Sequence, residues 1–126
     1  MIGTHFILDL FDIKDEIFSN NLSKSNYHLF DNYIRASLIK NKMTILNDQV
    51  HQFENLEGAF TSLYLLSESH LSIHTWPENN FIAVDIFTCG DCKTKNIVDD
   101  IISYLKPGKH IVKNISRGSE PIIKSQ

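Results

Sequence analysis

The sequence predicts an α+β domain in two layers, a mainly antiparallel sheet with two helices on one of its faces. Short apolar runs of the kind found in strands recur along the chain, and two segments repeat their apolar residues every three or four positions, as amphipathic helices do. The expected order is strand, helix, two or more strands, helix, strand. The length of 126 residues fits one domain, residues 1–126, around a single hydrophobic core.

The first half of the chain predicts a strand, a helix and a second strand. Residues 4–11 alternate apolar with more polar side chains, the pattern of a strand that buries one face. Residues 24–40 carry apolar side chains at helical spacing and predict an amphipathic helix. Residues 43–53 are rich in β-forming residues and predict a strand, although Asn47 and Asp48 interrupt them.

Two short apolar runs follow, residues 60–66 and 81–88, and both predict buried strands. The segment between them, residues 67–78, is dense in serine, histidine and glutamate, a composition typical of a surface loop or of a functional site. The alternation of Leu71 and Ile73 with polar neighbours favours extended backbone within it.

The chain then predicts a second helix and a last strand. Apolar residues at helical spacing mark a helix over residues 97–105 that stops at Pro107-Gly108, and Thr94 or Asp91 is available as its N-cap. Residues 109–115 are expected to complete the sheet.

Charge and hydropathy exclude some classes of partner. Twelve basic residues against fifteen acidic ones give a net charge of -3, so the chain lacks the cationic excess that neutralises nucleic-acid phosphates. No stretch reaches the roughly 20 apolar residues that span a bilayer, and the N-terminal apolar run contains Asp9 and no basic segment. We therefore expect a cytoplasmic protein with neither a nucleic-acid nor a membrane partner.

The two cysteines, Cys89 and Cys92, are too close in sequence to form a disulfide framework, so they are candidates for chemistry. Their spacing is that of a zinc knuckle, and His70 and His74 are four positions apart. If residues 71–75 are extended, however, the two imidazoles lie about 13 Å apart and cannot share one ion. We therefore expect no metal. A thioredoxin-like redox pair stays an alternative, since a helix is expected to begin soon after Cys92.

A serine nucleophile with histidine and cysteine as its proton-transfer partners is the other interpretation of these residues. The run SESHLSIHTWPE over residues 67–78, continued by FIAVDIFTCGD over residues 81–91, resembles the signature of the prokaryotic S-adenosylmethionine decarboxylase family. Further motifs on both flanks resemble the same family: Gly3-x-His5 with Leu8-Asp9, His51-x-Phe53, and Arg117-Gly118. The resemblance therefore covers most of the chain.

The resemblance implies an enzyme that makes its own pyruvoyl cofactor from Ser69, without pyridoxal phosphate and without a metal. In the family's chemistry the serine hydroxyl attacks the preceding carbonyl, an N-to-O acyl shift gives an ester, and elimination followed by hydrolysis leaves a pyruvoyl group. The cut falls between Glu68 and Ser69. Residues 1–68 then become the β chain and residues 69–126 the α chain.

The resemblance also implies proton-transfer roles. His74 corresponds to the family's proton acceptor in processing, and an imidazole suits that role because its pKa of about 6.5 lets it take up and return protons at neutral pH. Cys89 corresponds to the proton donor in catalysis, and the pyruvoyl ketone at Ser69 forms the Schiff base with the substrate amine. His74 is too far from Ser69 along a strand and on another side of a helix, so a turn is expected to bring them together. Cys92 has no implied role.

The implied reaction is decarboxylation of S-adenosyl-L-methionine to S-adenosylmethioninamine for spermidine synthesis. Phe53 corresponds to an aromatic side chain that stacks on the adenine, Thr61 to a hydroxyl of the pocket, and Glu78 to a carboxylate that binds the ribose hydroxyls. Two departures from the family lie near this expected pocket. Residues 54–60 form a longer connection without the usual proline, and Ser62 stands where a glycine is common.

Other functions stay open on the sequence alone. A pyruvoyl decarboxylase of ornithine or arginine is expected to keep Ser69, His74 and Cys89 without the adenine pocket. A zinc or redox protein built on Cys89 and Cys92, or a binding subunit that is never cleaved, are further alternatives. The family resemblance also implies a homodimer with active sites at the interface, and no requirement for an activating polyamine.

Overall fold

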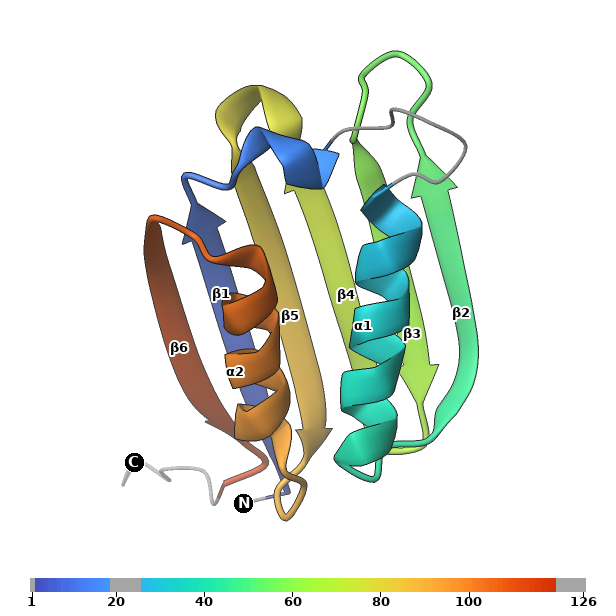
Figure 1. Ribbon diagram of the computed structural model, residues 1–126. Helices are drawn as coiled ribbons and strands as arrows, with labels where there is room; N and C mark the ends of the chain where they lie inside the picture. Colours follow the sequence, from blue (N-terminus) through green and yellow to red (C-terminus); the bar gives the residue numbers. More distant parts are fainter. Residues whose placement is uncertain (1, 19–25, 120–126) are drawn as a thin grey trace, which may run out of the picture.

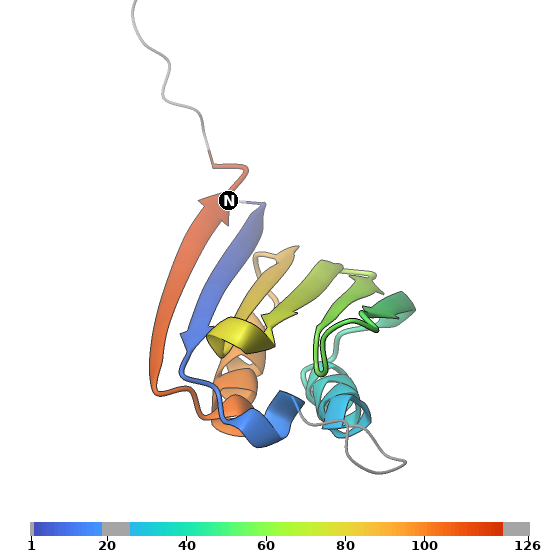
Figure 2. The same ribbon diagram turned by 90° about the horizontal axis from the view of Figure 1, so that it is seen from above.

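The computed structural model describes residues 2–18 and 26–119, which form a six-stranded sheet with two helices on one of its faces (Figures 1 and 2). This confirms the α+β, two-layer architecture expected from the sequence. Residues 24 and 25 of the expected first helix lie outside the described residues. No helix in the described part of the chain is long and apolar enough to cross a membrane.

The strands are β1 Gly3–Phe11, β2 Ile45–Gln52, β3 Phe60–Leu66, β4 Ser69–Trp76, β5 Phe81–Cys89 and β6 Lys109–Arg117. The helices are α1 Asn26–Lys40 and α2 Thr94–Leu105, with short 3-10 turns η1 Asp15–Phe18 and η2 Pro77–Asn79. The strand order is β2-β3-β4-β5-β1-β6, and every neighbouring pair is antiparallel. The hairpin of β4 and β5 therefore occupies the middle of the sheet.

β4 lies inside the polar segment between the two expected buried strands. Leu71, Ile73 and Thr75 are buried under the helices, whereas His70 and His74 alternate with them and point to the opposite face. Since no helix covers that second face in the described residues, its side chains need not be apolar. A strand in the middle of this sheet can therefore have a loop-like composition.

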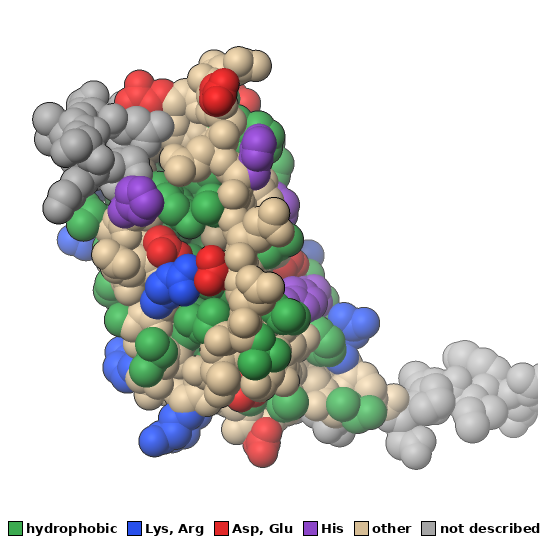
Figure 3. Space-filling model, turned by 90° about the vertical axis from the view of Figure 1, so that its right-hand side faces the viewer, with side chains coloured by type: hydrophobic (Ala, Val, Ile, Leu, Met, Phe, Trp, Pro, Cys, Tyr) green, Lys and Arg blue, Asp and Glu red, His purple; other side chains and the backbone are tan. Residues whose placement is uncertain are grey.

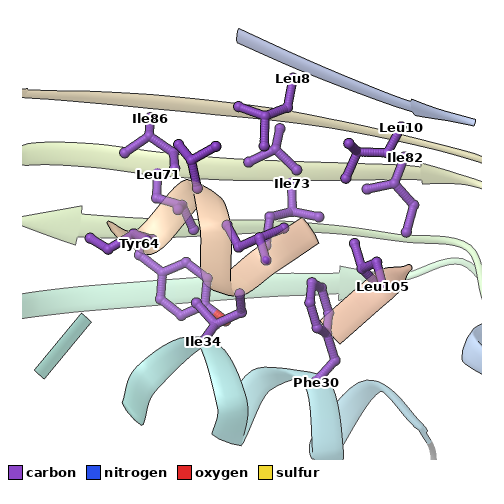
Figure 4. Close-up of a cluster of buried hydrophobic side chains, with 14 of the residues drawn as sticks. Leu8, Leu10, Phe30, Ile34, Tyr64, Leu71, Ile73, Ile82, Ile86 and Leu105 are labelled. Atoms are coloured by element: carbon purple, nitrogen blue, oxygen red, sulfur yellow. The ribbon is translucent and has the colours of Figure 1, made fainter. Parts of the chain in front are cut away.

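The hydrophobic core lies between the helices and one face of the sheet (Figure 4). Phe30 and Ile34 of α1 and Leu105 of α2 converge with Leu71 and Ile73 of β4, and each of these side chains is at most 2% exposed. Burying a side chain of this size contributes about 1.5–3 kcal/mol to the free energy of unfolding. Packing against the helices therefore fixes β4 in the sheet.

The start of α2 differs from the expectation. Neither Thr94 nor Asp91 is the N-cap, because Lys93 occupies that position and makes no side-chain cap hydrogen bond. Thr94 is the first residue of the helix, and its hydroxyl is hydrogen-bonded to the hydroxyl of Thr88 on β5. Both threonines are buried, so their hydroxyls satisfy each other inside the protein.

The face of the sheet opposite the helices has no covering element within residues 2–18 and 26–119, and we call it the open face (Figure 2). Its large hydrophobic side chains are 41–52% exposed: Leu63, Leu65, Trp76, Ile111 and Ile115. Seen from the β2 edge, hydrophobic and histidine side chains reach the surface along the margin away from the helices (Figure 3). Such a patch is typical of an interaction surface.

Candidate active site

A tight turn joins β3 to β4, and the bond between Glu68 and Ser69 lies at its end. Leu66 and Ser69 pair across the hairpin, so only Ser67 and Glu68 form the loop. Two hydrogen bonds hold this loop to Thr44: the Ser67 amide donates to the Thr44 carbonyl at 2.9 Å, and the Thr44 amide donates to Oε1 of Glu68 at 3.0 Å. The turn is therefore held to Thr44 at both of its residues, Ser67 and Glu68.

Ser69 has a strained backbone. Its φ angle is 146°, a region that L-residues other than glycine rarely adopt. Such a conformation costs on the order of 1–3 kcal/mol and persists only where the surrounding structure imposes it. The Ser69 hydroxyl lies 3.3 Å from Nδ1 of His70, which can accept its proton in the tautomer that is protonated at Nε2. Ser69 therefore has both a strained backbone and a neighbouring imidazole that can accept its hydroxyl proton.

Cys89 reaches the same turn from the end of β5. Its thiol donates to the backbone carbonyl oxygen of Glu68, with 3.8 Å between sulfur and oxygen. A cavity of about 180 Å³ lies beside Ser69 and Cys89 and is bounded by the ring of Phe87. Gly3 makes room for that ring, because a Cβ at Gly3 would lie 2.7 Å from Cε1 of Phe87. A small group at Ser69 therefore has space next to the thiol.

A second group of candidate residues lies at the other end of the open face. Oγ1 of Thr61 is 3.2 Å from Nδ1 of His74, and the strand register places His51, Thr61 and His74 side by side on β2, β3 and β4. The ring of Phe53 packs edge-on against His51, with 4.6 Å between centroids. Glu78 follows in the exposed turn η2, just beyond the end of β4.

The predicted site residues thus fall into two groups at opposite ends of β4. Ser69 is the first residue of the strand and His74 the sixth, which separates them by about 17 Å at roughly 3.3 Å per residue. The turn expected between them is therefore wrong, because cross-strand pairs with β3 and β5 keep residues 69–76 extended. Within one chain, Ser69 meets Glu68, His70 and Cys89 but not His74.

The histidines and cysteines do not assemble into a metal centre. No group of three or more His, Cys, Asp or Glu side chains that could hold a metal ion occurs in the ranges 2–18 and 26–119. His70 and His74 are on a strand, where four positions correspond to about 13 Å, so they cannot share an ion. The structure therefore gives the zinc-protein interpretation no support in its described residues.

A larger cavity of about 360 Å³ lies at the same end of the sheet as Ser69. Its lining comes from the end of α1, the β3–β4 turn and the loop before α2: Asn41, Lys42, Glu68, Cys89, Asp91, Cys92 and Lys93. Cys92 is half-buried against the core. Burial, and then the nearby Cys89, Asp91 and Glu68, raise the pKa of the Cys92 thiol. Cys92 therefore stays protonated at neutral pH.

Two residues that contact Ser69 or Glu68 were not assigned to this site from the sequence. His70 was considered only as a metal ligand, yet it is the imidazole that contacts Ser69. Its position immediately after Ser69 was the only signal available. Thr44 holds the side chain of Glu68 from 24 residues away, and no pattern in the sequence could have linked the two residues.

Comparisons with known proteins agree with this fold. The family model described as S-adenosylmethionine decarboxylase matches residues 4–118. An S-adenosylmethionine decarboxylase proenzyme of Hydrogenobaculum sp. is 37% identical over 115 residues, which cover 90% of this chain and 79% of that protein. The S-adenosylmethionine decarboxylase proenzyme 2 of Bacillus cereus is 36% identical over 122 residues, which cover 96% of this chain and 93% of that protein.

A solved structure supports the same relationship. The crystal structure of the adenosylmethionine decarboxylase from Aquifex aeolicus superposes with a TM-score of 0.80 and 27% sequence identity, covering 99% of this chain and 98% of that chain. Sequence and fold thus agree over nearly the whole length. The protein belongs to the S-adenosylmethionine decarboxylase family.

Proposed function

We propose that this protein is a self-cleaving, pyruvoyl-dependent decarboxylase of S-adenosyl-L-methionine. The single observation that carries the proposal is the meeting of three features at one peptide bond. Ser69 has a strained φ of 146°, the Glu68 carbonyl accepts from the Cys89 thiol, and a cavity lies beside both. Family membership supports the reaction type and the substrate class.

Cleavage at Glu68–Ser69 begins with attack of the Ser69 hydroxyl oxygen on the Glu68 carbonyl carbon. His70 accepts the hydroxyl proton, and the Cys89 thiol donates to the carbonyl oxygen as negative charge develops there. The peptide C–N bond then breaks, leaving an ester between residue 68 and the serine oxygen and a free amine on residue 69. Elimination then removes the α-proton of residue 69 and breaks the bond between its Cβ and the ester oxygen, which releases residues 1–68 with a C-terminal carboxylate. Hydrolysis of the dehydroalanine left at residue 69 releases its nitrogen as ammonia and gives residues 69–126 an N-terminal pyruvoyl group.

The residues around Ser69 fit a pyruvoyl group, since the adjoining cavity of about 180 Å³ is bounded by Gly3 and Phe87 and reached by Cys89. When formed, that group supplies a ketone for the substrate amine and an electron sink for decarboxylation. Cys89 then returns a proton to the carbon that has lost carbon dioxide. The chemistry requires neither pyridoxal phosphate nor a metal.

His74 enters the site from a second copy of the chain. Within one protomer His74 is about 17 Å from Ser69 at roughly 3.3 Å per residue of strand, too far for proton transfer. A two-fold axis that sets the β4 strands of two protomers antiparallel places the Ser69 end of one strand opposite the His74 end of the other. Because such an interface is isologous, it creates two composite sites.

The open face supplies the surface for this homodimer. Its exposed Leu63, Leu65 and Ile111 surround the middle of the sheet, and the two groups of candidate residues lie at its ends. Packing two open faces together would bury this apolar surface. The homodimer and the cytoplasmic location expected from the sequence belong to this proposal.

Substrate binding is assigned to the second group of residues. Phe53 is 47% exposed and available to stack on an adenine ring, while the hydroxyl of Thr61 fixes the imidazole of His74 at 3.2 Å. The carboxylate of Glu78 is exposed at the same end of the sheet and can accept from both hydroxyls of a ribose. These residues would meet the substrate bound at the partner's pyruvoyl group.

An assay of the purified protein tests the proposed function. Protein dialysed without pyridoxal phosphate is expected to release carbon dioxide from carboxyl-labelled S-adenosyl-L-methionine but not from labelled L-methionine, which lacks the adenosyl group. The Ser69→Ala variant is the matched control and is expected to release none. Fully cleaved protein that releases no carbon dioxide from S-adenosyl-L-methionine would contradict the proposed substrate.

A further inference from the structure

We propose that Cys89 and Cys92 form a redox-active pair, a second reactive site that exchanges with low-molecular-weight disulfides and closes to a Cys89–Cys92 disulfide. Neither cleavage nor decarboxylation uses Cys92. The existence of the cysteine pair is independent of the proposed function. The effect of the pair on catalysis rests on the proposed function.

The backbone brings the two cysteines together. The amide of Cys92 donates to the carbonyl of Cys89 at 3.2 Å, which closes a hydrogen-bonded turn with the two cysteines at its ends. A turn of this type holds its end Cα atoms within about 7 Å of each other. A disulfide requires Cα atoms roughly 4.4–6.8 Å apart, so the bond can form with little backbone movement.

The surroundings give the two thiols different roles. Both are free thiols that line the cavity of about 360 Å³, with Cys89 exposed and Cys92 half-buried. An exposed thiol is accessible to a small disulfide, whereas Cys92 is protected by the core and has a raised pKa. Cys89 is therefore the attacking thiol and Cys92 the resolving one. The two cysteines have the Cys-x-x-Cys spacing of thiol–disulfide redox motifs and lie just before α2, which begins at Thr94.

The exchange is balanced in two steps. The Cys89 thiolate attacks one sulfur of a small disulfide RSSR, forms the mixed disulfide Cys89–S–S–R and releases RS⁻. Cys92 loses its proton to solvent and attacks the Cys89 sulfur, which forms the intramolecular disulfide and releases the second RS⁻. The two cysteine thiols are oxidised by two electrons, and RSSR is reduced to two thiols. A dithiol reverses both steps.

Closure of the disulfide has a direct consequence at the active site. The Cys89 sulfur would no longer carry a proton for the Glu68 carbonyl or for the substrate carbon. Oxidised protein is therefore expected to lack decarboxylase activity and to regain it on reduction. The decarboxylase would then be active only where the thiol pool is reducing.

The test uses cleaved wild-type protein incubated with oxidised glutathione and analysed by intact mass, peptide mapping and activity. The fragment that carries Cys89 is expected to lose two hydrogen atoms without keeping a glutathione adduct, and mapping is expected to find Cys89 joined to Cys92. Dithiothreitol is expected to restore both the mass and the activity.

Cys92→Ser is the matched variant, since it keeps the Cys89 thiol and removes only the resolving one. It is expected to retain its activity when reduced, and after oxidation to keep a glutathione adduct that the wild type does not keep. A stable adduct on the wild type, or no reaction of either cysteine, would overturn the inference. Reduced protein that is inactive yet closes the disulfide would count against the proposed function and leave the redox pair standing.

Discussion

The thiol of Cys89 and the backbone carbonyl of Glu68 are hydrogen-bonded partners, 3.8 Å apart and 21 residues apart in sequence. This contact joins the end of β5 to the turn between β3 and β4. The same sulfur therefore faces the bond proposed to break and the group proposed to form there. One side chain can serve in cleavage as a hydrogen-bond donor and in decarboxylation as an acid.

Changing Cys89 is expected to affect the two reactions unequally. Cys89→Ala removes a weak S–H donor from the Glu68 carbonyl, so self-cleavage is expected to slow by about tenfold. Loss of the proton donor is expected to lower the decarboxylation rate of the cleaved protein by roughly 10²–10⁴-fold. Gel densitometry over time gives the first rate, and labelled carbon dioxide release from fully cleaved protein gives the second. Equal losses in both rates would refute separate roles.

The two histidines of β4 are expected to act at different steps. His70→Gln removes the base beside the Ser69 hydroxyl, so the first attack is expected to slow and no ester to accumulate. His74→Gln leaves that attack intact but blocks the elimination, so the ester is expected to persist. Hydroxylamine cleaves esters and not peptide bonds, and is expected to split the His74 variant at residue 68 while leaving the His70 variant whole. The reverse pattern would exchange the two roles.

Complementation tests whether the active site is shared between protomers. Ser69→Ala and His74→Gln chains, each with a different affinity tag, are expected to be inactive alone. In a mixed dimer, Ser69 of the His74→Gln chain faces His74 of the other chain. In protein recovered through both tags, the His74→Gln chain is therefore expected to be cleaved and the Ser69→Ala chain to stay uncut. Mixed dimers in which neither chain is cleaved would show that His74 acts within its own chain.

Much of the sheet could be predicted because its strands alternate or are continuously apolar. The strand expected at residues 60–66 is confirmed with the same bounds, and the strand expected at residues 81–88 extends by one residue to Cys89. β4 was harder to predict, because only Leu71, Ile73 and Thr75 mark its buried face. The other face of β4 is polar because it belongs to the open face of the sheet. Which face of a sheet stays uncovered cannot be predicted from a single sequence.

The candidate site could be predicted as a set of residues but not as an arrangement. Ser69, Cys89 and the Glu68–Ser69 bond were found from their motif, and the structure brings them together. The position of His74 depends on whether residues 69–74 turn or extend. The alternation of Leu71 and Ile73 favoured an extended backbone, whereas the role implied for His74 beside Ser69 required a turn. Pairing with β3 and β5 on both sides keeps the strand extended, as the alternation indicated, and leaves His74 far from Ser69 within one chain.

The free energy of unfolding is expected to fall at alkaline pH because of Tyr64, a buried tyrosine. Burial, and then the hydrogen bond from the Tyr64 hydroxyl to Asp31, raise the pKa of Tyr64 above its ordinary value of 10.0. Because the folded pKa exceeds the unfolded one, this contribution to the free energy of unfolding is fully present below pH 10.0 and decreases as the pH rises above it. Urea unfolding between neutral pH and pH 11 measures the effect.

Tyr64→Phe is the variant for that experiment. It is expected to lower the free energy of unfolding by about 1–3 kcal/mol at pH 7, because a hydrogen bond to a charged carboxylate is lost. The difference in the free energy of unfolding between Tyr64→Phe and the wild type is expected to become smaller above about pH 10. Tyr33→Phe, which removes a hydroxyl without a hydrogen-bond partner in the described residues, is the control. A difference in the free energy of unfolding that stays constant at all pH values would contradict the raised pKa of Tyr64.

The intact mass of the purified protein under denaturing conditions tests self-cleavage most directly. We predict two fragments that divide between Glu68 and Ser69, with the C-terminal one carrying a pyruvoyl group in place of the serine. The Ser69→Ala variant should give one uncut chain. A wild-type chain that also stays uncut on prolonged incubation, or that is cut at another bond, would contradict the proposal that Ser69 becomes the cofactor.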